Sequence, residues 1–246
     1  HLVVAVSLRR PDGRTALYEL AVDARTSEPK ASEKTPKNLP SFCPNRHINQ
    51  DGSFCMSWRA AETNCVTDQA SAQEWWALLL KFLRLQETVT QLRRWPNNHA
   101  WAHGDAAEAQ RRAETCAMAL GSAIEHSLAA GRLSVTRASG QPRFVRLEEG
   151  SRRLYSVWRE AKRVATLRQR CFCGSGRPLR SCADHADRAA ELVTALEAWE
   201  AGECEFWSQL RGRTCCGTLI ECPLKARANS DAPPASSFAN AKARAA

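Results

Sequence analysis

The chain has 246 residues, of which 43% are hydrophobic and 25% charged, and this composition excludes a disordered protein. Its formal net charge of +9 is compatible with acidic partners. However, the basic residues are scattered and nearby aromatic residues lie at core spacing, which favours a solvated surface over a nucleic-acid interface. The longest apolar run, Trp75 to Leu80, is broken by Lys81, which excludes a membrane-spanning helix.

Eleven cysteines raise the question of a disulfide scaffold. Such scaffolds are much shorter chains, and several of these cysteines cluster at metal-ligand spacing. We therefore expect reduced thiols and a cytoplasmic protein. The sequence shows no signal peptide and begins His-Leu-Val-Val without a methionine, in a strand-like pattern, so we expect a further segment before residue 1.

The first elements alternate apolar and polar residues. Residues 2–9 and 15–24 both do so, and the turn-forming residues 11–14 separate them, which predicts a β-hairpin. Residues 25–40 are polar and contain prolines and lysines, which predicts a loop.

Helical patterns follow in the middle of the chain. A capping-box pattern at residues 71–74 opens an apolar stripe that runs to Leu92, and Pro96 predicts the end of this helix. A second capping pattern begins at Asp105. It predicts a helix that ends near Gly131 and whose alanine-rich face packs closely on the first helix.

The C-terminal half predicts a mixed but mainly helical region. Residues 132–147 predict a short hairpin, residues 150–170 a basic amphipathic helix, and residues 184–211 a long helix. Residues 226–246 are rich in alanine, serine, proline and asparagine, which predicts a disordered tail.

A cysteine cluster lies before the last long helix, in the pattern Cys171-Phe-Cys173-Gly-Ser-Gly with Cys182 and His185 behind it. Thiolates bind zinc tetrahedrally, a Cys-x-Cys turn holds two ligands, and the two glycines supply the backbone freedom that the turn needs. Four protein ligands leave no open position, so we predict one structural zinc. Two alternatives are unliganded cysteines and a phosphate cradle, although the Gly-Ser-Gly lacks the Lys-Ser/Thr of a P-loop.

The same segment resembles the SEC-C zinc motif, in which Cys-x-Cys-Gly-Ser-Gly and a basic patch precede a cysteine followed directly by Cys or His. Ala183 occupies that last position here. The fourth ligand is therefore His185 or a residue from elsewhere. Whether the remaining C-terminal cysteines form a second metal site stays open, because their spacing matches no known pattern; they are Cys204, Cys215, Cys216 and Cys222.

The segment Arg46-His47-Ile48-Asn49-Gln50-Asp51-Gly52-Ser53-Phe54-Cys55 is a polar, turn-forming run that ends on one cysteine. This layout presents a thiol on a shaped loop, as covalent thioester chemistry requires. We expect Asp51 and Ser53 to shape the Gly52 turn. The alternative for Cys55 is an ordinary buried cysteine.

This segment resembles the active site of ubiquitin-conjugating enzymes, in which a His-Pro-Asn tripeptide precedes a turn, a glycine and the catalytic cysteine. The Asn of that tripeptide lies eight positions before the cysteine. His47 takes its position here and Arg46 that of the Pro, a form similar to the bacterial branch of the family. Those proteins belong to ubiquitin-like conjugation operons, several of them linked to phage defence. Cys43-Pro44-Asn45 imitates the tripeptide two residues out of register, and we interpret it as a decoy unless an insertion restores its role.

The resemblance implies an α+β fold. An antiparallel β-meander with an active-site loop and packed helices would occupy residues 1–131, a mainly helical zinc-containing region residues 132–225, and the tail residues 226–246. The resemblance is incomplete, because the family's first helix and about two of its four strands are not visible.

The resemblance also implies a transferase. Cys55 would accept a ubiquitin-like modifier from an activating enzyme as a thioester and pass it to an amine of a protein target. His47 would then be an oxyanion donor, a general base or a structural brace of the loop. The alternatives from other classes are a catalytically inactive zinc-binding adaptor and a nucleic-acid-binding zinc protein.

Overall fold

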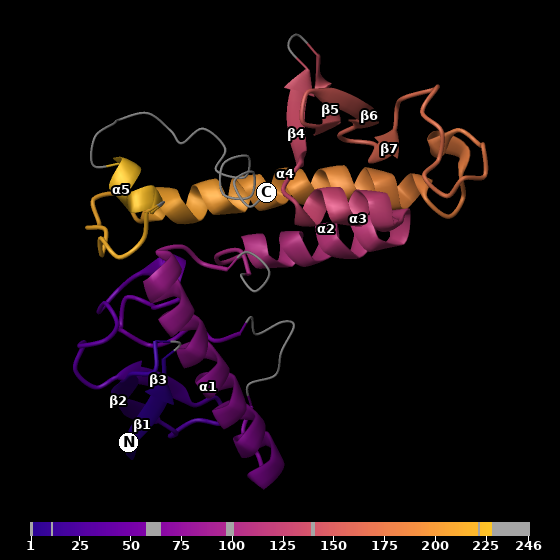
Figure 1. The fold of residues 1–246 in the computed structure, drawn as a ribbon. Coiled ribbons are helices and arrows are strands. Elements are labelled where there is room, and N and C mark those ends of the chain that lie inside the picture. The colour runs from indigo at the N-terminus through magenta and orange to yellow at the C-terminus, as the bar shows by residue number, and fades with distance from the viewer. Residues whose placement is uncertain are drawn as a thin grey trace. The chain divides into compact units, whose positions relative to one another are not determined.

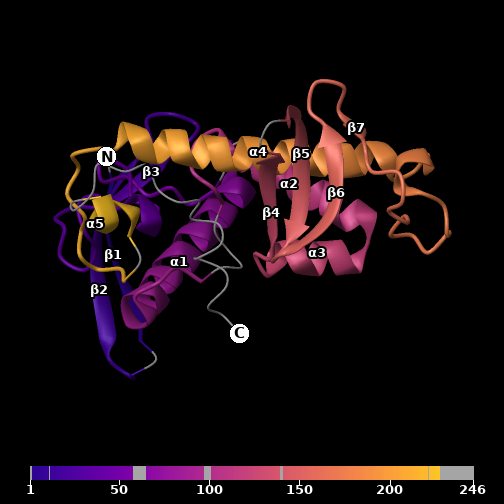
Figure 2. The ribbon, with the colours of Figure 1, turned by 90° about the horizontal axis from the view of Figure 1, so that it is seen from above.

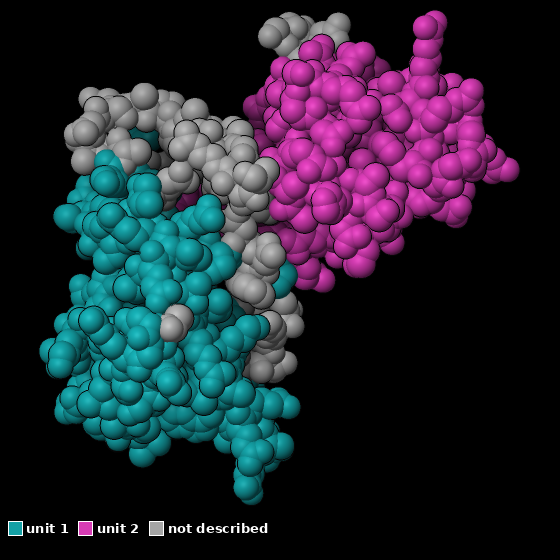
Figure 3. Space-filling model, in the orientation of Figure 1, with its two compact units in different colours: residues 1–101, 211–231 teal, residues 102–210, 232–246 magenta. Residues whose placement is uncertain are grey.

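The computed structural model describes residues 2–10, 12–57, 65–96, 101–138, 141–220 and 222–227. The chain divides into two compact units (Figure 1, Figure 3). Unit 1 comprises the chain up to Trp101 together with the segment that begins at Arg211, and unit 2 comprises Ala102–Leu210. The first domain expected from the sequence, residues 1–131, extends past this division, because the helices that follow Trp101 fold with unit 2.

The described residues of unit 1 contain a three-stranded antiparallel sheet in the order β1-β2-β3, one long helix and two short ones. Its elements are β1 (Leu2–Arg9), β2 (Thr15–Asp23), β3 (Lys30–Glu33), the 3-10 helix η1 (Pro44–Arg46), α1 (Gln69–Leu92) and α5 (Pro223–Arg227). The predicted hairpin is confirmed as β1 and β2. The loop predicted over residues 25–40 is wrong in part, because β3 lies within it. The Glu33 carboxylate explains why the strand stops there, since it accepts the backbone N–H groups of Lys37, Asn38 and Leu39.

The core of unit 1 lies between one face of this sheet and helix α1. Tyr18 and Leu20 of β2 and Leu79 and Leu83 of α1 are all at most 1% exposed. The period of two in the strands and of 3.6 in the helix direct these side chains to one interface. At its edge the Tyr18 hydroxyl donates to Glu87 at 2.5 Å, and burial raises the pKa of Tyr18 far above its usual range.

Helix α1 begins three residues before the predicted start. Asp68 is its N-cap, because the Asp68 carboxylate accepts the Ser71 N–H at 2.8 Å. The Ser71 hydroxyl accepts the Asp68 N–H at 3.0 Å in return. The capping box is therefore Asp68 with Ser71, and Ser71 is its inner partner rather than the cap itself. The helix ends at Leu92, followed by Arg93 in the left-handed region.

The described residues of unit 2 contain a four-stranded antiparallel sheet in the order β4-β5-β6-β7, three α-helices and one short 3-10 helix, with the sheet lying on α4 (Figure 2). Its elements are α2 (Ala106–Leu120), α3 (Ser122–Ala129), β4 (Leu133–Ala138), β5 (Gln141–Glu149), β6 (Arg152–Trp158), β7 (Arg163–Val164), the 3-10 helix η3 (Leu179–Ser181) and α4 (Ala186–Gln209). The hairpin predicted over residues 132–147 is confirmed as β4 and β5, and the long helix predicted over residues 184–211 is confirmed as α4. The predicted second helix is divided at Gly121, whose φ of 111° interrupts the helical backbone.

The amphipathic helix predicted over residues 150–170 is wrong. The segment forms β6 and β7 instead. Leu154 is the extra residue of a β-bulge in β6, so Leu154 and the next residue, Tyr155, are both buried, as is Val157. This spacing imitates a helical stripe, although it arises from a strand.

Helix α2 packs along α4, whereas the sequence predicts its alanine-rich face to pack on the first helix. Ala106, Ala109, Ala113 and Ala117 are all buried in the core of unit 2. The closest approach is at Gly202 of α4, where an added Cβ would lie 2.9 Å from the Ala106 Cβ. Small residues on both helices therefore permit this close packing.

Within the part of the chain that the structure describes, no helix is long and apolar enough to cross a membrane. Nearly all of the tail predicted at residues 226–246 lies outside the described residues, which end with α5 at Arg227.

Candidate functional site

The Cys55 loop, residues 43–55, is closed by backbone hydrogen bonds. Cys43 and Ile48 exchange two of them, from the Cys43 N–H at 3.1 Å and from the Ile48 N–H at 3.0 Å. Helix η1 occupies the residues between them, with Pro44 at its first turn. The Cys55 N–H then donates to the His47 carbonyl at 2.8 Å. The two predicted catalytic residues are thus tied to each other through the backbone.

A tight turn at residues 49–53 shapes the middle of this loop. Gly52 has a φ of 78°, a conformation that other residues rarely adopt. The Asp51 carboxylate accepts the Ser53 N–H at 3.0 Å and the Ser53 hydroxyl at 2.5 Å, and these bonds lower the pKa of Asp51. The Asn49 N–H donates to the Ser53 carbonyl at 2.8 Å. Asp51 and Ser53 therefore engage each other within the turn.

Phe54 anchors the end of the loop. Its N–H donates to the Ala31 carbonyl of β3 at 2.8 Å, and its ring stacks on Phe82 of α1 with centroids 4.9 Å apart. Phe54 is buried, and the next side chain, Cys55, is exposed. This alternation is that of an extended chain, and it brings the thiol to the surface of unit 1.

Arg46 fastens the loop to helix α1. Its side chain is buried, and its guanidinium donates to the Gln86 side chain at 2.8 Å, to the Gln86 carbonyl at 3.1 Å and to the Thr90 hydroxyl at 2.8 Å. The Gln86 amide donates back to the Arg46 carbonyl at 2.6 Å. The sequence carries no signal of this role, because arginine is mostly exposed in proteins.

His47 lies between the Arg46 anchor and the turn. Its φ of 53° is left-handed, which is uncommon outside glycine and is often found at functional sites. The imidazole packs on Trp95, with ring centroids 4.6 Å apart. Trp95 lies beyond the end of α1 and far from His47 in the chain, so the sequence gives no sign of this contact.

The thiol of Cys55 is not activated by a neighbouring cation in the residues that the structure describes. Its Sγ lies 3.9 Å from the Ser57 carbonyl. Although the residue is exposed at the surface, protein atoms around the sulfur remove part of its hydration and raise the pKa of the Cys55 thiol. At neutral pH the sulfur is therefore protonated, and its nucleophilic form is a minor species.

Unit 2 brings the four predicted metal ligands together. The ligand atoms of Cys171, Cys173, Cys182 and His185 all lie within 4.8 Å of one another. Cys171 and Cys182 are buried, and the Cys182 Sγ lies 3.3 Å from the His185 Nδ1. His185 is the residue directly before α4, so the start of that helix positions the imidazole.

Local backbone geometry builds the first half of this cluster. The Cys171 N–H donates to the Arg177 carbonyl at 2.9 Å, which closes the turn that holds Cys173. Gly174 and Gly176 both have a positive φ, of 72° and 71°. Ser175 hydrogen-bonds the Cys173 sulfur and lowers the pKa of Cys173 to about 6.

The donor set fits a zinc ion. Three sulfurs and one imidazole are ligands that zinc prefers, in a tetrahedron with Zn–S bonds of about 2.3 Å. Such a tetrahedron separates its sulfurs by about 3.8 Å, so the cluster needs only a small contraction to enclose the ion. The cluster is therefore able to hold a metal.

The four C-terminal cysteines outside the cluster are divided between the units. Cys204 is exposed on α4 in unit 2, whereas Cys215, Cys216 and Cys222 belong to unit 1. The His103 imidazole lies 3.1 Å from the Glu203 carboxylate of α4. The His103 carbonyl also accepts the Ala106 N–H, so His103 belongs to the start of α2.

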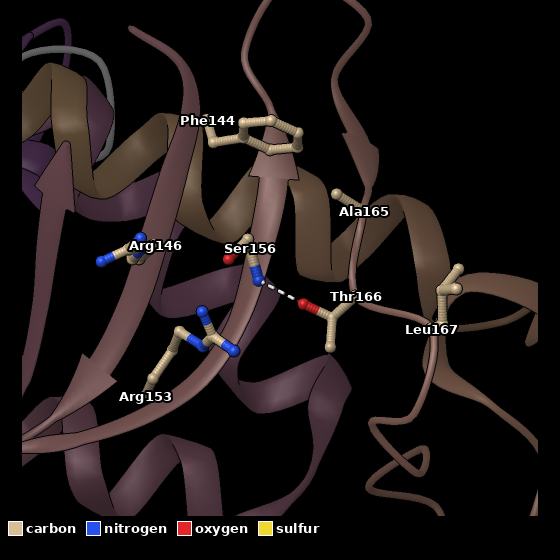
Figure 4. Close-up of a pocket in the computed structure, with 7 residues that line it drawn as sticks. All are labelled: Phe144, Arg146, Arg153, Ser156, Ala165, Thr166 and Leu167. Atoms are coloured by element: carbon tan, nitrogen blue, oxygen red, sulfur yellow. Dashed lines mark hydrogen bonds between the residues drawn. The ribbon is translucent and has the colours of Figure 1, made fainter. Parts of the chain in front are cut away.

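A cavity of about 300 Å³ opens beside the sheet of unit 2 (Figure 4). The Ser156 N–H donates to the Thr166 hydroxyl at 2.8 Å along its wall. Its lining consists of Phe144, Arg146, Arg153, Ser156, Ala165, Thr166 and Leu167. These residues include no carboxylate, thiol or imidazole, so they supply neither a nucleophile with a lowered pKa nor a general base. The Cys55 loop and the cysteine cluster are the stronger candidates.

Two protein-family models match the chain. Residues 1–97 match the family described as prokaryotic E2 domain, and residues 102–224 match the family described as cysteine-rich domain, C-terminal to E2 domain. The first match ends just before the division between unit 1 and unit 2, and the second begins at it. No match was found among curated proteins or among solved structures.

Proposed function

Because the chain belongs to the prokaryotic E2 proteins that carry a cysteine-rich C-terminal domain, we propose that it transfers a ubiquitin-like modifier through a thioester on Cys55. Its partners are then an activating enzyme, the modifier and a protein target. The resemblance of residues 46–55 to conjugating enzymes of bacterial defence operons supports a role in an antiphage conjugation system.

The proposed reaction has two transfers. The Cys55 thiolate attacks the C-terminal carbonyl carbon of the modifier, a new C–S bond forms, and the cysteine of the activating enzyme leaves as a thiolate. A target amine then attacks the same carbon, a C–N bond forms, Cys55 leaves as a thiolate, and the amine loses a proton. Each step passes through a tetrahedral oxyanion, which a nearby neutral donor stabilises.

The observation that carries this proposal is that the Cys55 thiol is exposed, whereas the side chains that anchor its loop are buried. Phe54 and Arg46 hold the loop on β3 and α1, so they fix the position of the sulfur while leaving it open to a protein partner. A cysteine that only fills a core is buried, which Cys55 is not.

In this proposal His47 stabilises the oxyanion. It occupies the register of the family's asparagine, its carbonyl is bonded to the Cys55 N–H, and Trp95 supports its ring. A neutral imidazole N–H is a suitable donor for a developing oxyanion. The same contacts are compatible with a purely structural brace, and substitution of His47 distinguishes the two.

We further propose that the cysteine cluster of unit 2 binds zinc and that the ion is structural. Cys171, Cys173, Cys182 and His185 would fill all four positions of its tetrahedron. The bound ion would link the glycine-rich turn after β7 to the start of α4. Because these segments contain little regular structure before α4, such a link contributes directly to the folding of this region.

The test of the Cys55 assignment is adduct formation by the full chain. Incubation with the cognate activating enzyme, modifier and ATP is expected to give a reductant-sensitive adduct. Cys55→Ala should abolish the adduct, and Cys55→Ser should trap a reductant-resistant ester. Cys204→Ala removes another exposed thiol and should leave the adduct unchanged.

An adduct that persists in Cys55→Ala contradicts the assignment. A wild-type chain that forms no adduct favours the adaptor alternative. If the chain forms no adduct but binds nucleic acid, and this binding weakens steeply with salt, the result favours the nucleic-acid-binding zinc protein.

A further inference from the structure

Four cysteines lie in two pairs at the base of the Cys55 loop, within unit 1. Cys43 comes from the loop itself, and Cys215, Cys216 and Cys222 come from the C-terminal segment, residues 211–227. The Cys43 and Cys216 sulfurs are 3.0 Å apart. The Cys215 and Cys222 thiols hydrogen-bond to each other, and Cys222 interacts electrostatically with Cys43, which links the two pairs.

The burial of these sulfurs is that of a structural site. Cys43 and Cys222 are buried, and Cys215 and Cys216 are half-buried. The 3.0 Å separation of the Cys43 and Cys216 sulfurs is too long for a disulfide bond of about 2.05 Å. It is shorter than the roughly 3.8 Å between sulfurs on one tetrahedral zinc. Among the described residues, only the cluster of unit 2 has three or more ligand atoms already grouped as a metal requires. A central ion therefore requires the Cys43–Cys216 pair to open slightly and the two pairs to close on each other.

A buried cation lies close enough to balance the negative charge of such a site. The Arg46 guanidinium interacts electrostatically with both Cys43 and Cys216. Four thiolates around a divalent ion carry a net charge of about −2, and burying that charge is costly without a compensating cation. Arg46 is held in place by Gln86 and Thr90 and supplies that compensation.

In the described residues, few hydrogen bonds attach the C-terminal segment to the rest of unit 1. The Ile220 N–H donates to the Arg93 carbonyl at 2.9 Å, the Arg93 guanidinium donates to the Gly217 carbonyl at 3.4 Å, and the Arg213 guanidinium donates to Gln50 at 3.0 Å. Helix α5 has five residues, too few to be stable alone. Short segments of this kind commonly depend on a metal or a disulfide.

We propose that Cys43, Cys215, Cys216 and Cys222 bind a second structural metal ion of the zinc class, which joins the C-terminal segment to the base of the Cys55 loop. Cys43 thus replaces Cys204 in the set of four C-terminal cysteines considered from the sequence, because Cys204 is exposed in unit 2. The ion holds the residue that opens helix η1, four positions before His47. The site does not depend on the chemistry of Cys55.

Metal content of the full chain, purified without chelator, tests the proposal. The wild type is expected to hold two zinc ions per chain. Cys43→Ser, Cys216→Ser and Cys173→Ser should each hold one, and the double variant Cys43→Ser with Cys173→Ser should hold none. The matched control Cys204→Ser should hold two. One zinc in the wild type, or two in Cys43→Ser, overturns the proposal.

Alkylation of the native wild type gives a test that needs no variant to fold. The four cysteines should resist iodoacetamide until a chelator is added, whereas Cys204 should react at once, as mass spectrometry of peptides will show. Equal modification of the four with and without chelator overturns the proposal. Recovery of a Cys43–Cys216 disulfide from protein prepared under reducing conditions also overturns it.

Discussion

The Cys55 loop and the cysteine cluster of unit 2 use the same side chain in opposite surroundings. Cys55 is exposed, and partial desolvation of its sulfur raises the pKa of the thiol. In the cluster Ser175 lowers the pKa of Cys173 to about 6, and three further ligand atoms lie nearby. The chemistry of a cysteine depends on its thiolate fraction and on the groups around its sulfur. The single thiol of Cys55 therefore suits covalent transfer, whereas the grouped thiols of the cluster suit metal binding.

The two sites also differ in how they are held. Buried side chains at Arg46 and Phe54 fasten the Cys55 loop to a completed sheet and helix. The cluster rests in part on a glycine-rich turn, and residues 173–178 of this turn are all exposed. We therefore expect the loop to keep its geometry when the cluster of unit 2 releases its metal, and the cluster to lose its own geometry.

Loss of the zinc from the cluster of unit 2 should have the largest effect on the protein. In Cys173→Ser the cluster is expected to lose its zinc, and the segment between β7 and α4 should become protease-sensitive. Structural zinc contributes on the order of 10 kcal/mol of binding free energy, which is also folding free energy. The rate of Cys55 alkylation should be unchanged, with Cys204→Ser as the control. A wild type without zinc, or an altered Cys55 rate, would break the comparison.

The pH dependence of Cys55 alkylation should be the next largest effect. Because its pKa is raised above the ordinary value of a thiol, the thiolate fraction should still be rising between pH 8 and 9 and should increase by at least about tenfold between pH 7 and 9. Iodoacetamide labelling followed by mass spectrometry measures this rate. A rate that levels off below pH 8 would mean that the thiol is activated and that the contrast with the cluster is smaller.

Substitution of His47 tests whether the loop supplies more than a thiol. His47→Ala should slow transfer of the modifier to an amine by about a hundredfold, and loading of Cys55 by less, because the activating enzyme assists that step. His47→Asn keeps a neutral N–H donor and should retain most of the rate. Single-turnover discharge assays measure both. An unchanged rate in a folded His47→Ala protein would leave only the structural role.

Packing of α2 on α4 should respond to a single methyl group. Glycine to alanine within a helix usually stabilises it by about 0.5–1 kcal/mol. Gly202→Ala should instead destabilise unit 2 by about 1–3 kcal/mol, because its Cβ would lie 2.9 Å from that of Ala106. Urea unfolding measures this change, and adding Ala106→Gly should restore part of the loss. A more stable Gly202→Ala would contradict the close contact.

The smallest effect expected is at Glu200 of α4. Burial, and then the neighbouring Glu197, raise the pKa of Glu200 to about 7. The folded state therefore holds a proton that the unfolded state releases above pH 4.5, so stability is lost as the pH rises from 4.5 to 7. Glu200→Gln should stabilise unit 2 by about 1 kcal/mol at pH 8 and change little at pH 5. The exposed Glu205→Gln is the control, and equal effects at both pH values would contradict the shift.

Several features followed from the sequence because they depend on residues close together in the chain. The alternation in residues 2–9 and 15–24 was sufficient for the hairpin, since the period of two is a local property. The Cys-x-Cys turn with Cys182 and His185 was recognisable for the same reason, and the structure brings those ligand atoms together. The turn around Gly52 likewise uses side chains only two residues apart.

Other features were decided only by the tertiary structure. No local pattern shows that Arg46 is buried against Gln86, that α2 packs on α4, or that Cys43 lies beside Cys216. These contacts join residues far apart in the chain, and their free energy comes from burial and packing at surfaces that exist only after folding. At Leu154 the local pattern was misleading, because a β-bulge formed by pairing of β6 with β5 gave buried residues the spacing of a helix. Residue spacing encodes local geometry, whereas the partners of each surface are selected by the fold as a whole.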